Sequence, residues 1–182
     1  MPESGTPAAI GYAQASGIPY GQGLVKNSYV GRTFIQPSQT IRQLGIRLKL
    51  NPLRDVIAGQ RVVVVDDSIV RGSTSGPIVE LLRAHGATEV HMRICSPPIR
   101  HQCFFGVDMA RRDDLIASRK DIESIRKHIG ADTLGYLSLD GMVNATGGTV
   151  GDLCTACFTG DYLVPVQLEL AKDSLEAEPV KA

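Results

Sequence analysis

The hydrophobic pattern of the chain is most distinctive between residues 61 and 95. Val62 to Val65 are four consecutive β-branched residues between polar neighbours, which is typical of a strand buried on both faces of a parallel sheet. A loop of small residues then leads into a helical period over residues 75–84, and residues 89–95 alternate as a second strand does. The pattern therefore predicts a β–α–β unit in an α/β fold with a parallel sheet.

Weaker periodic stretches predict the remaining elements. A turn at residues 2–7 precedes a predicted helix over 8–16. Further predictions are strands over 19–25 and 133–139, helices over 38–50, 114–120, 121–129 and 141–145, and a disordered polar tail over 171–182. Because the first turn leads directly into a helix, we expect a strand before it, and we interpret the chain as a fragment.

Charge and composition narrow the classes of function. The 182 residues include 19 basic and 19 acidic ones, so net charge gives no support for a nucleic-acid or membrane partner. No apolar run approaches the ~20 residues that span a bilayer, and the polar start does not resemble a secretory signal. With four cysteines and no such signal, we expect a cytoplasmic protein with reduced or metal-bound thiols.

The end of the valine run carries the clearest chemistry. Asp66 and Asp67 follow the strand directly, at the point where open α/β sheets bind ligands. The loop after them offers backbone N–H groups and hydroxyls at a helix start, which favours a phosphate, while the acids suit ribose hydroxyls or Mg²⁺. No G-x-x-x-x-G-K-[ST] motif is present. The alternatives are an ordinary strand end with surface acids and a Walker B strand, which would need a separate phosphate loop.

Two other groups of residues have more than one interpretation. The basic residues Lys26, Arg32, Arg42, Arg47 and Lys49 form either a solvated face or a mobile flap that closes over a polyphosphate and excludes water. Taken alone, the C-x-x-C at residues 154–157 could bind zinc, take part in redox chemistry or occur by chance. The cysteine at position 95 is interpreted as a small buried hydrophobic residue.

The run VVVVDDSIVRGST resembles the phosphoribosyl pyrophosphate (PRPP) signature of type I phosphoribosyltransferases. Together with KNSYVGRTFIQPSQ, SPPIRHQCFFGVD, IGADTLGYLSLDG and CTACFTGDY, it resembles the C-terminal half of the amidophosphoribosyltransferase family, in its iron–sulfur-containing branch. The resemblance covers about residues 1–162. It implies a type I phosphoribosyltransferase domain over 1–145 without its first strand, a flexible loop at about 26–50, and an irregular cysteine-containing segment over 146–170.

The resemblance also implies an activity. Enzymes of this family convert PRPP and ammonia into 5-phosphoribosylamine and pyrophosphate, the first committed step of purine (IMP) biosynthesis. The ammonia comes from glutamine through a glutaminase half that this chain lacks, so we expect the fragment alone to be inactive with glutamine. The intact enzyme is expected to be a homo-oligomer, a tetramer, and no side chain is expected to act as a catalytic nucleophile.

Site residues carry over from the family by position. The expected PRPP-binding residues are Lys26, Arg32, Asp66, Asp67, Ser68, Ile69, Val70, Arg71, Gly72, Ser73, Thr74 and Ser75. The expected Mg²⁺ site consists of Ser4, Asp66 and Asp67. The expected ligands of a [4Fe–4S] cluster are Cys103, Cys154 and Cys157, with the fourth ligand of the family outside this chain.

Two other functions share the PRPP signature. A stand-alone nucleobase phosphoribosyltransferase would not account for the CTACFTGDY segment. A non-catalytic PRPP-sensing module would call for a DNA-binding segment, and the chain shows neither a helix-turn-helix pattern nor a basic excess.

Overall fold

The computed structural model describes residues 1–27, 29, 48–107 and 111–165. The predicted flap residues Arg32, Arg42 and Arg47, most of the predicted helix over 38–50 and the predicted tail lie outside these ranges. Among the described residues, no helix is long and apolar enough to cross a membrane.

A parallel sheet forms the centre of the fold, as the sequence predicts. Its three strands are β3 (Arg61–Asp66), β4 (Glu89–Ile94) and β5 (Thr133–Tyr136), in the spatial order β3-β4-β5. Both pairings are parallel, and Val64 lies opposite Met92 in the first of them. A separate antiparallel pair joins β1 (Leu24–Lys26) to β2 (Leu50–Pro52). The α/β class and the β–α–β unit are therefore confirmed.

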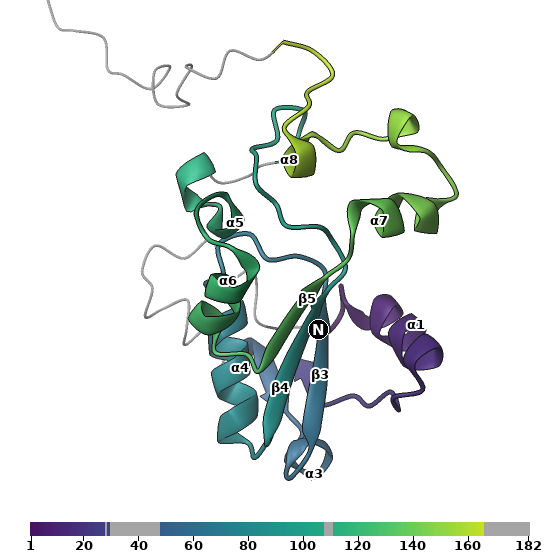
Figure 1. Cartoon of the computed structure of the whole chain (residues 1–182). Coiled ribbons are helices and arrows are strands. Elements are labelled where there is room, and N and C mark those ends of the chain that lie inside the picture. The colour runs from purple at the N-terminus through teal and green to yellow at the C-terminus, as the bar shows by residue number, and fades with distance from the viewer. Residues whose placement is uncertain (28, 30–47, 108–110, 166–182) are drawn as a thin grey trace, which may run out of the picture.

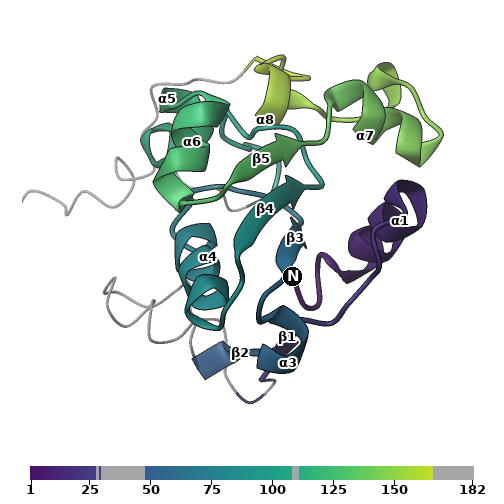
Figure 2. The ribbon, with the colours of Figure 1, turned by 60° about the horizontal axis from the view of Figure 1, so that its bottom comes forward.

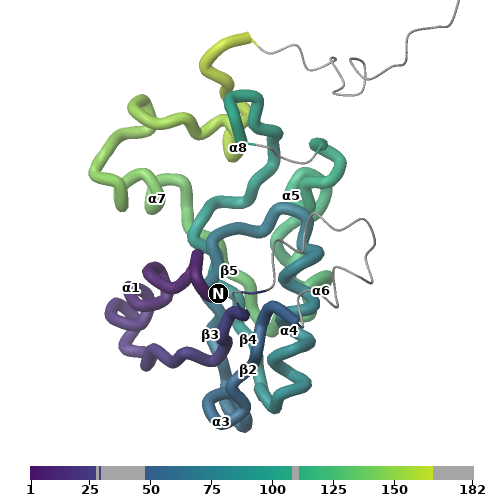
Figure 3. Tube along the Cα trace, turned by 180° about the vertical axis from the view of Figure 1, so that it is seen from behind, coloured from purple at the N-terminus to yellow at the C-terminus, as the bar shows by residue number. Residues whose placement is uncertain are grey.

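Helices lie on both sides of the sheet (Figures 1 and 2). α4 (Ser75–Ala84) and α6 (Ile122–Ile129) pack on one side, while α1 (Thr6–Ser16) packs against β3 on the other. The view from behind in Figure 3 shows the same separation. The remaining helical elements are α3 (Arg54–Ile57), η2 (Arg112–Asp114), α5 (Ile116–Arg119), α7 (Leu139–Thr146), η3 (Val150–Asp152) and α8 (Ala156–Thr159).

The core lies between the sheet and α4. The apolar residues of α4 recur at helical spacing, so Ile78, Val79, Leu81 and Leu82 all face inward and are buried. Val90 and Met92 of β4 are fully buried opposite them. Burial of such side chains stabilises a fold by roughly 1.5–3 kcal/mol each. This packing holds α4 against β4, and the pairing of β3 with β4 then sets the position of the carboxyl end of β3.

Capping interactions hold the helix ends close to their predicted positions. The Asp121 side chain accepts the Ser124 N–H at 2.7 Å at the start of α6, and Gly130 ends that helix with φ +72°. Asp132 Oδ2 accepts the Val90 N–H at 2.6 Å and Arg83 Nη2 at 2.7 Å. These bonds tie α4, β4 and the start of β5 together.

Several local predictions differ from the structure. The strand predicted over 133–139 ends at Tyr136, because the Ser138 side chain caps α7, which begins at Leu139. The strand predicted over 19–25 begins only at Leu24, because Pro19 has no N–H to donate and the glycines between favour irregular backbone. Leu50 belongs to β2 and not to a helix. In the valine run, Val64 and Val65 are buried, but Val62 and Val63 are only half-buried. Within the described residues β3 is an edge strand, which is why burial on both faces is incomplete.

Candidate functional site

Two adjacent carboxylates lie at the carboxyl end of β3. Asp66 is the last residue of the strand and is 8% exposed, because its side chain lies on the same face as the buried Val64. Asp67 begins the loop and is exposed. The backbone N–H of Asp67 donates to Asp66 Oδ1 at 3.0 Å. Alternation along the strand therefore places one acid against the core and the other toward solvent.

The two acids titrate in opposite directions. Burial, followed by the charge of Asp67, raises the pKa of Asp66 to about 7. Burial alone would also raise the pKa of Asp67, but hydrogen bonds from the Ser4 and Ser68 side chains outweigh it and lower that pKa below its usual value. Near neutral pH the pair therefore holds one full negative charge and one carboxyl that a cation can readily ionise.

The loop after the acids is rich in unused hydrogen-bond donors. In the part of the chain that the structure describes, the backbone N–H groups of residues 71–75 have no acceptor. Gly72 has φ +77°, and a Cβ on it would come within 2.9 Å of Ile116 Cδ1. The positive φ favours glycine in this turn, after which the chain enters α4. Five free donors at a helix start favour an anion such as a phosphate.

The turn at residues 2–5 closes the site from the other side. Gly5 lies against the Val65 carbonyl so closely that no side chain would fit there. The neighbouring Ser4 hydroxyl is therefore held at Asp67, to which it donates a hydrogen bond. Lys26 of β1 reaches the same turn, with Nζ 2.6 Å from Glu3 Oε2. One hydroxyl and one cation thus lie beside the acid pair.

The described residues of the predicted PRPP site thus gather around the end of β3. The structure brings together the acid pair, the loop over residues 68–75, Ser4 and Lys26. Arg32 lies outside the described residues. Sequence reasoning missed Glu3, which binds Lys26, and Asp114, whose Oδ2 lies 3.5 Å from Arg71 Nη2. No sequence signal reveals these pairs, because their members are 23 and 43 positions apart.

The predicted ligands of the [4Fe–4S] cluster lie in the loop after β4 and in and beside α8. The carbonyl of Cys157 in α8 accepts the N–H groups of Arg100 and His101, both at 3.0 Å. Tyr162 donates its hydroxyl to the Gln102 carbonyl at 2.8 Å and packs edge-on to Phe104, with ring centroids 5.2 Å apart. These contacts hold the 154–162 segment against the loop after β4, which Figure 1 shows beside α8.

The three predicted cluster cysteines therefore lie in one corner of the fold. Burial raises the pKa of the Cys157 thiol, and the neighbouring Cys103 and Cys154 thiols raise it further. The Phe105 N–H points at Cys103 Sγ at 3.5 Å. Even so, no group of three or more His, Cys, Asp or Glu side chains among the described residues is arranged to hold a single metal ion.

Comparison with known proteins identifies close relatives. No protein-family model matches the chain. It is 54% identical over 182 residues to the amidophosphoribosyltransferase of Synechococcus elongatus, covering 100% of this chain and 37% of that protein. It is 59% identical over 183 residues to the amidophosphoribosyltransferase of Mycobacterium tuberculosis, covering 97% of this chain and 35% of that protein. The chain thus spans little more than a third of the length of these relatives.

A solved structure gives the same result. The glutamine PRPP amidotransferase from B. subtilis, complexed with ADP and GMP, matches with a TM-score of 0.81 at 54% identity. The match covers 92% of this chain and 38% of that one. The predicted type I phosphoribosyltransferase fold is confirmed by this likeness.

Proposed function

We propose that this chain is the PRPP-binding transferase part of an amidophosphoribosyltransferase. Nearly the whole chain aligns with such enzymes, and the aligned part is about a third of their length. The observation that carries the proposal is the pairing of two carboxylates with the backbone N–H groups of residues 71–75, none of which has an acceptor among the described residues, at the end of one strand. The donors suit the 5-phosphate of PRPP, and the acids suit its ribose hydroxyls.

In the proposed reaction, ammonia attacks C1 of the ribose. The C1–N bond forms, the C1–O bond to pyrophosphate breaks, pyrophosphate leaves with the bonding electron pair, and ammonia loses one proton. The transition state carries positive charge on the ribose and growing negative charge on the leaving group. In the proposal, Asp66 and Asp67 face the positive charge on the ribose, and Lys26, whose Nζ reaches the turn at residues 2–5, faces the negative charge on the leaving pyrophosphate. No side chain is required as a nucleophile.

Mg²⁺ fits the same site. Proteins hold Mg²⁺ through one or two carboxylates together with substrate phosphates, so two acids and the Ser4 hydroxyl are a sufficient set of oxygen donors. Bound there with PRPP, Mg²⁺ would neutralise charge on the diphosphate. The contribution of this chain is to hold Asp67 toward the ligand through the hydrogen bonds from Ser4 and Ser68.

A [4Fe–4S] cluster fits the cysteine-rich corner. In such a cluster each thiolate binds a different iron, so Cys103, Cys154 and Cys157 need only surround a common space and need not converge on one ion. The Cys103 and Cys154 thiols both contribute to the raised pKa of Cys157, which supports their proximity to it. The Phe105 N–H directed at Cys103 Sγ is the type of hydrogen bond that tunes a cluster sulfur.

The wider context rests on the resemblance to the amidophosphoribosyltransferase family and is part of the proposal. Glutamine is the source of the ammonia, delivered by a glutaminase part that the described residues do not include. The intact protein acts in purine biosynthesis in the cytoplasm and assembles as a homo-oligomer, a tetramer. Arg32, which lies outside the described residues, remains a proposed PRPP-binding residue.

Isothermal titration with PRPP and Mg²⁺ tests the proposed site. Asp67→Asn should weaken PRPP binding at least tenfold, because it removes the ionised carboxylate that Ser4 and Ser68 orient. Asp55→Asn on the exposed side of α3 is the matched control and should bind as the parent chain does. Absence of saturable PRPP binding to the parent chain would contradict the proposal, as would equal binding by both variants.

A turnover assay separates the enzyme from its alternatives. With PRPP and ammonia as the only substrates, release of pyrophosphate is expected if this fold retains the transferase chemistry. Release only when a free nucleobase is added would instead indicate a nucleobase phosphoribosyltransferase. Tight PRPP binding without turnover of either kind would indicate a sensing module.

A further inference from the structure

Two stretches of chain that are far apart in the sequence form the cysteine-rich corner, which contains Cys103, Cys154 and Cys157. A first tie joins them through the Cys157 carbonyl, which accepts the N–H groups of Arg100 and His101. Cys103 lies beyond this tie, in a loop that has neither helix nor strand. The place of Cys103 beside the other two thiols therefore depends on what holds this loop past His101.

A second tie lies directly beside Cys103. The Tyr162 hydroxyl donates to the carbonyl of Gln102 at 2.8 Å, across a separation of 60 positions. Gln102 is the residue before Cys103, and Tyr162 follows the C-x-x-C at residues 154–157. The three thiols thus lie between two ties along the chain, and Tyr162 supplies the second of them.

The Tyr162 ring also joins two phenylalanines. Its centroid is 5.2 Å from that of Phe104 and 6.2 Å from that of Phe105, and both pairs are edge-on. These distances lie within the range of favourable aromatic pairs, about 4.5–7 Å. Phe104 and Phe105 are 40% and 43% exposed, so the three rings form an aromatic layer at the surface and not part of the buried core. Such a layer limits the access of water to the atoms beneath it.

The thiols lie beside this aromatic layer. The Phe105 N–H is directed at Cys103 Sγ at 3.5 Å, so the backbone of the layer contacts a sulfur directly. Burial raises the pKa of Tyr162, and all three thiols of the corner raise it further, while Arg112 opposes them. The Tyr162 hydroxyl therefore stays protonated at neutral pH and remains a hydrogen-bond donor to Gln102.

We propose that Tyr162 is a positioning residue for the cysteine-rich corner. Its hydroxyl holds Cys103 beside the C-x-x-C, and its ring, packed on Phe104 and Phe105, limits the access of water and oxidants to the sulfurs. Loss of the hydroxyl frees the loop at Gln102, whereas loss of the ring also opens the aromatic layer. The inference rests on the proposed cluster only for the retention of metal, since the contacts themselves involve only residues of this chain.

Thiol reactivity in the metal-free, reduced chain tests this role. The chain is alkylated with iodoacetamide, and the rate at each cysteine is followed by mass spectrometry. Tyr162→Phe should raise the rate at Cys103 about two- to tenfold, because the loop opens more often once a hydrogen bond of this kind is lost. Tyr162→Leu should raise it further, by at least about tenfold, because two ring contacts are lost as well. Cys95 is the internal control, because it lies at the end of β4 beside Asp66, and its rate should not change.

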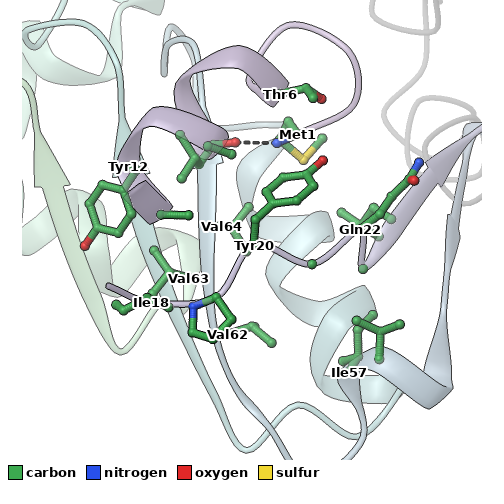
Figure 4. A pocket seen from close by; sticks show the side chains of 18 of the residues that line it. Met1, Thr6, Tyr12, Ile18, Tyr20, Gln22, Ile57, Val62, Val63 and Val64 are labelled. Carbon is green, nitrogen blue, oxygen red and sulfur yellow. Dashed lines mark hydrogen bonds between the residues drawn. The ribbon is translucent and has the colours of Figure 1, made fainter. Parts of the chain in front are cut away.

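Tyr20→Phe and Tyr20→Leu are the matched control variants. Tyr20 lines the groove beside β3, which Figure 4 shows, and not the cysteine-rich corner, so neither change should alter the rate at any thiol. Retention of iron is the second readout. After anaerobic reconstitution with iron and sulfide, Tyr162→Leu should lose iron to a chelator fastest, Tyr162→Phe should lose it more slowly, and the Tyr20 variants should match the parent chain.

Equal alkylation rates at Cys103 in the parent chain and both Tyr162 variants would overturn the proposal. A rise at Cys95 as large as that at Cys103 would also overturn it, because it would show a general loosening of the fold. Should Tyr162→Leu fail to fold, Tyr162→Phe still decides the role of the hydroxyl, since it keeps the ring. A parent chain that holds no iron would count against the proposed cluster alone, and the alkylation rates would still decide the role of Tyr162.

Discussion

Lys26 and Glu3 form an ion pair, with Nζ 2.6 Å from Oε2, that links β1 to the turn carrying Ser4. The Lys26 side chain is 28% exposed and that of Glu3 is 72% exposed, so the cation is the more firmly held partner. The hydrogen bond from Lys26 lowers the pKa of Glu3, which is therefore ionised at neutral pH. In the absence of ligand, the Glu3 carboxylate is paired with Lys26, the cation that we expect to bind the pyrophosphate.

Glu3→Gln should therefore strengthen the binding of Mg²⁺–pyrophosphate and PRPP. An exposed ion pair of this kind contributes little, so the expected gain is about two- to fivefold at low salt and less as salt is added. Isothermal titration at two ionic strengths measures it. In a Lys26→Gln background the same substitution should have no effect. A gain of equal size in that background, or weaker binding in the single variant, would show that Glu3 does not act through Lys26.

Gly72→Ala tests the shape of the phosphate loop. A Cβ at this position would come within 2.9 Å of Ile116 Cδ1, and the backbone has φ +77°, so the free N–H groups must move. PRPP binding should fall at least tenfold. Gly59→Ala is the matched control, since Gly59 has φ +74° but no atom within 4 Å of the added Cβ. Both variants should lose about 1 kcal/mol of stability, and only the first should lose affinity. Equal affinities would contradict the loop's role.

The adjacent acids should have opposite effects on stability as pH changes. The pKa of Asp66 is raised to about 7 in the folded chain, so its contribution is present below the unfolded value of ~3.9 and lost as pH rises through about 7. Asp66→Asn should therefore raise the urea midpoint at pH 8 and have little benefit at pH 4. The pKa of Asp67 is lowered, so its contribution is present above ~3.9 and lost at lower pH. Asp67→Asn should lower the midpoint at pH 8.

Urea titrations of both variants between pH 4 and pH 8 provide the measurement. Because Asn keeps the size of Asp, differences between the two sites report on charge and not on packing. Two variants that shift the midpoint in the same direction at pH 8 would contradict the assignment of one buried and one hydrogen-bonded carboxylate.

Removal of single thiols tests the cluster proposal. After anaerobic reconstitution with iron and sulfide, Cys103→Ser, Cys154→Ser and Cys157→Ser should each lose bound iron and visible absorbance. Cys95→Ser is the control, because Cys95 follows β4 beside Asp66 and lies outside the corner formed by α8 and the loop after β4. Loss of iron in Cys95→Ser, or no iron in the parent chain, would contradict the proposed ligand set.

Local chemistry in the sequence was enough to predict the central elements. α4 begins at Ser75 and ends at Ala84 as predicted, because its apolar spacing and the following Gly86 specify both its face and its end. β3 and β4 were equally predictable from composition and alternation. Once β3 was predicted, the acid pair and the loop over residues 68–75 could be assigned to its carboxyl end, because they follow it directly in the sequence.

Features that depend on long-range pairing could not be predicted in this way. β1 and β2 are three-residue strands that pair with each other; the strand predicted over 19–25 overlaps β1 only at its end, and β2 was not predicted. The ion pair between Lys26 and Glu3 depends on that pairing. The edge position of β3 was also not predicted, because its composition is that of a central strand.

The most direct test of PRPP binding is an NMR titration of the isotope-labelled chain with PRPP in the presence of Mg²⁺. The backbone amide resonances of residues 71–75 should shift saturably and more than those of any other segment, since their N–H groups have no acceptor among the described residues. Ribose 5-phosphate should shift the same amides with lower affinity. Shifts confined to another part of the fold, or no saturable change at millimolar PRPP, would show that this loop is not the phosphate site.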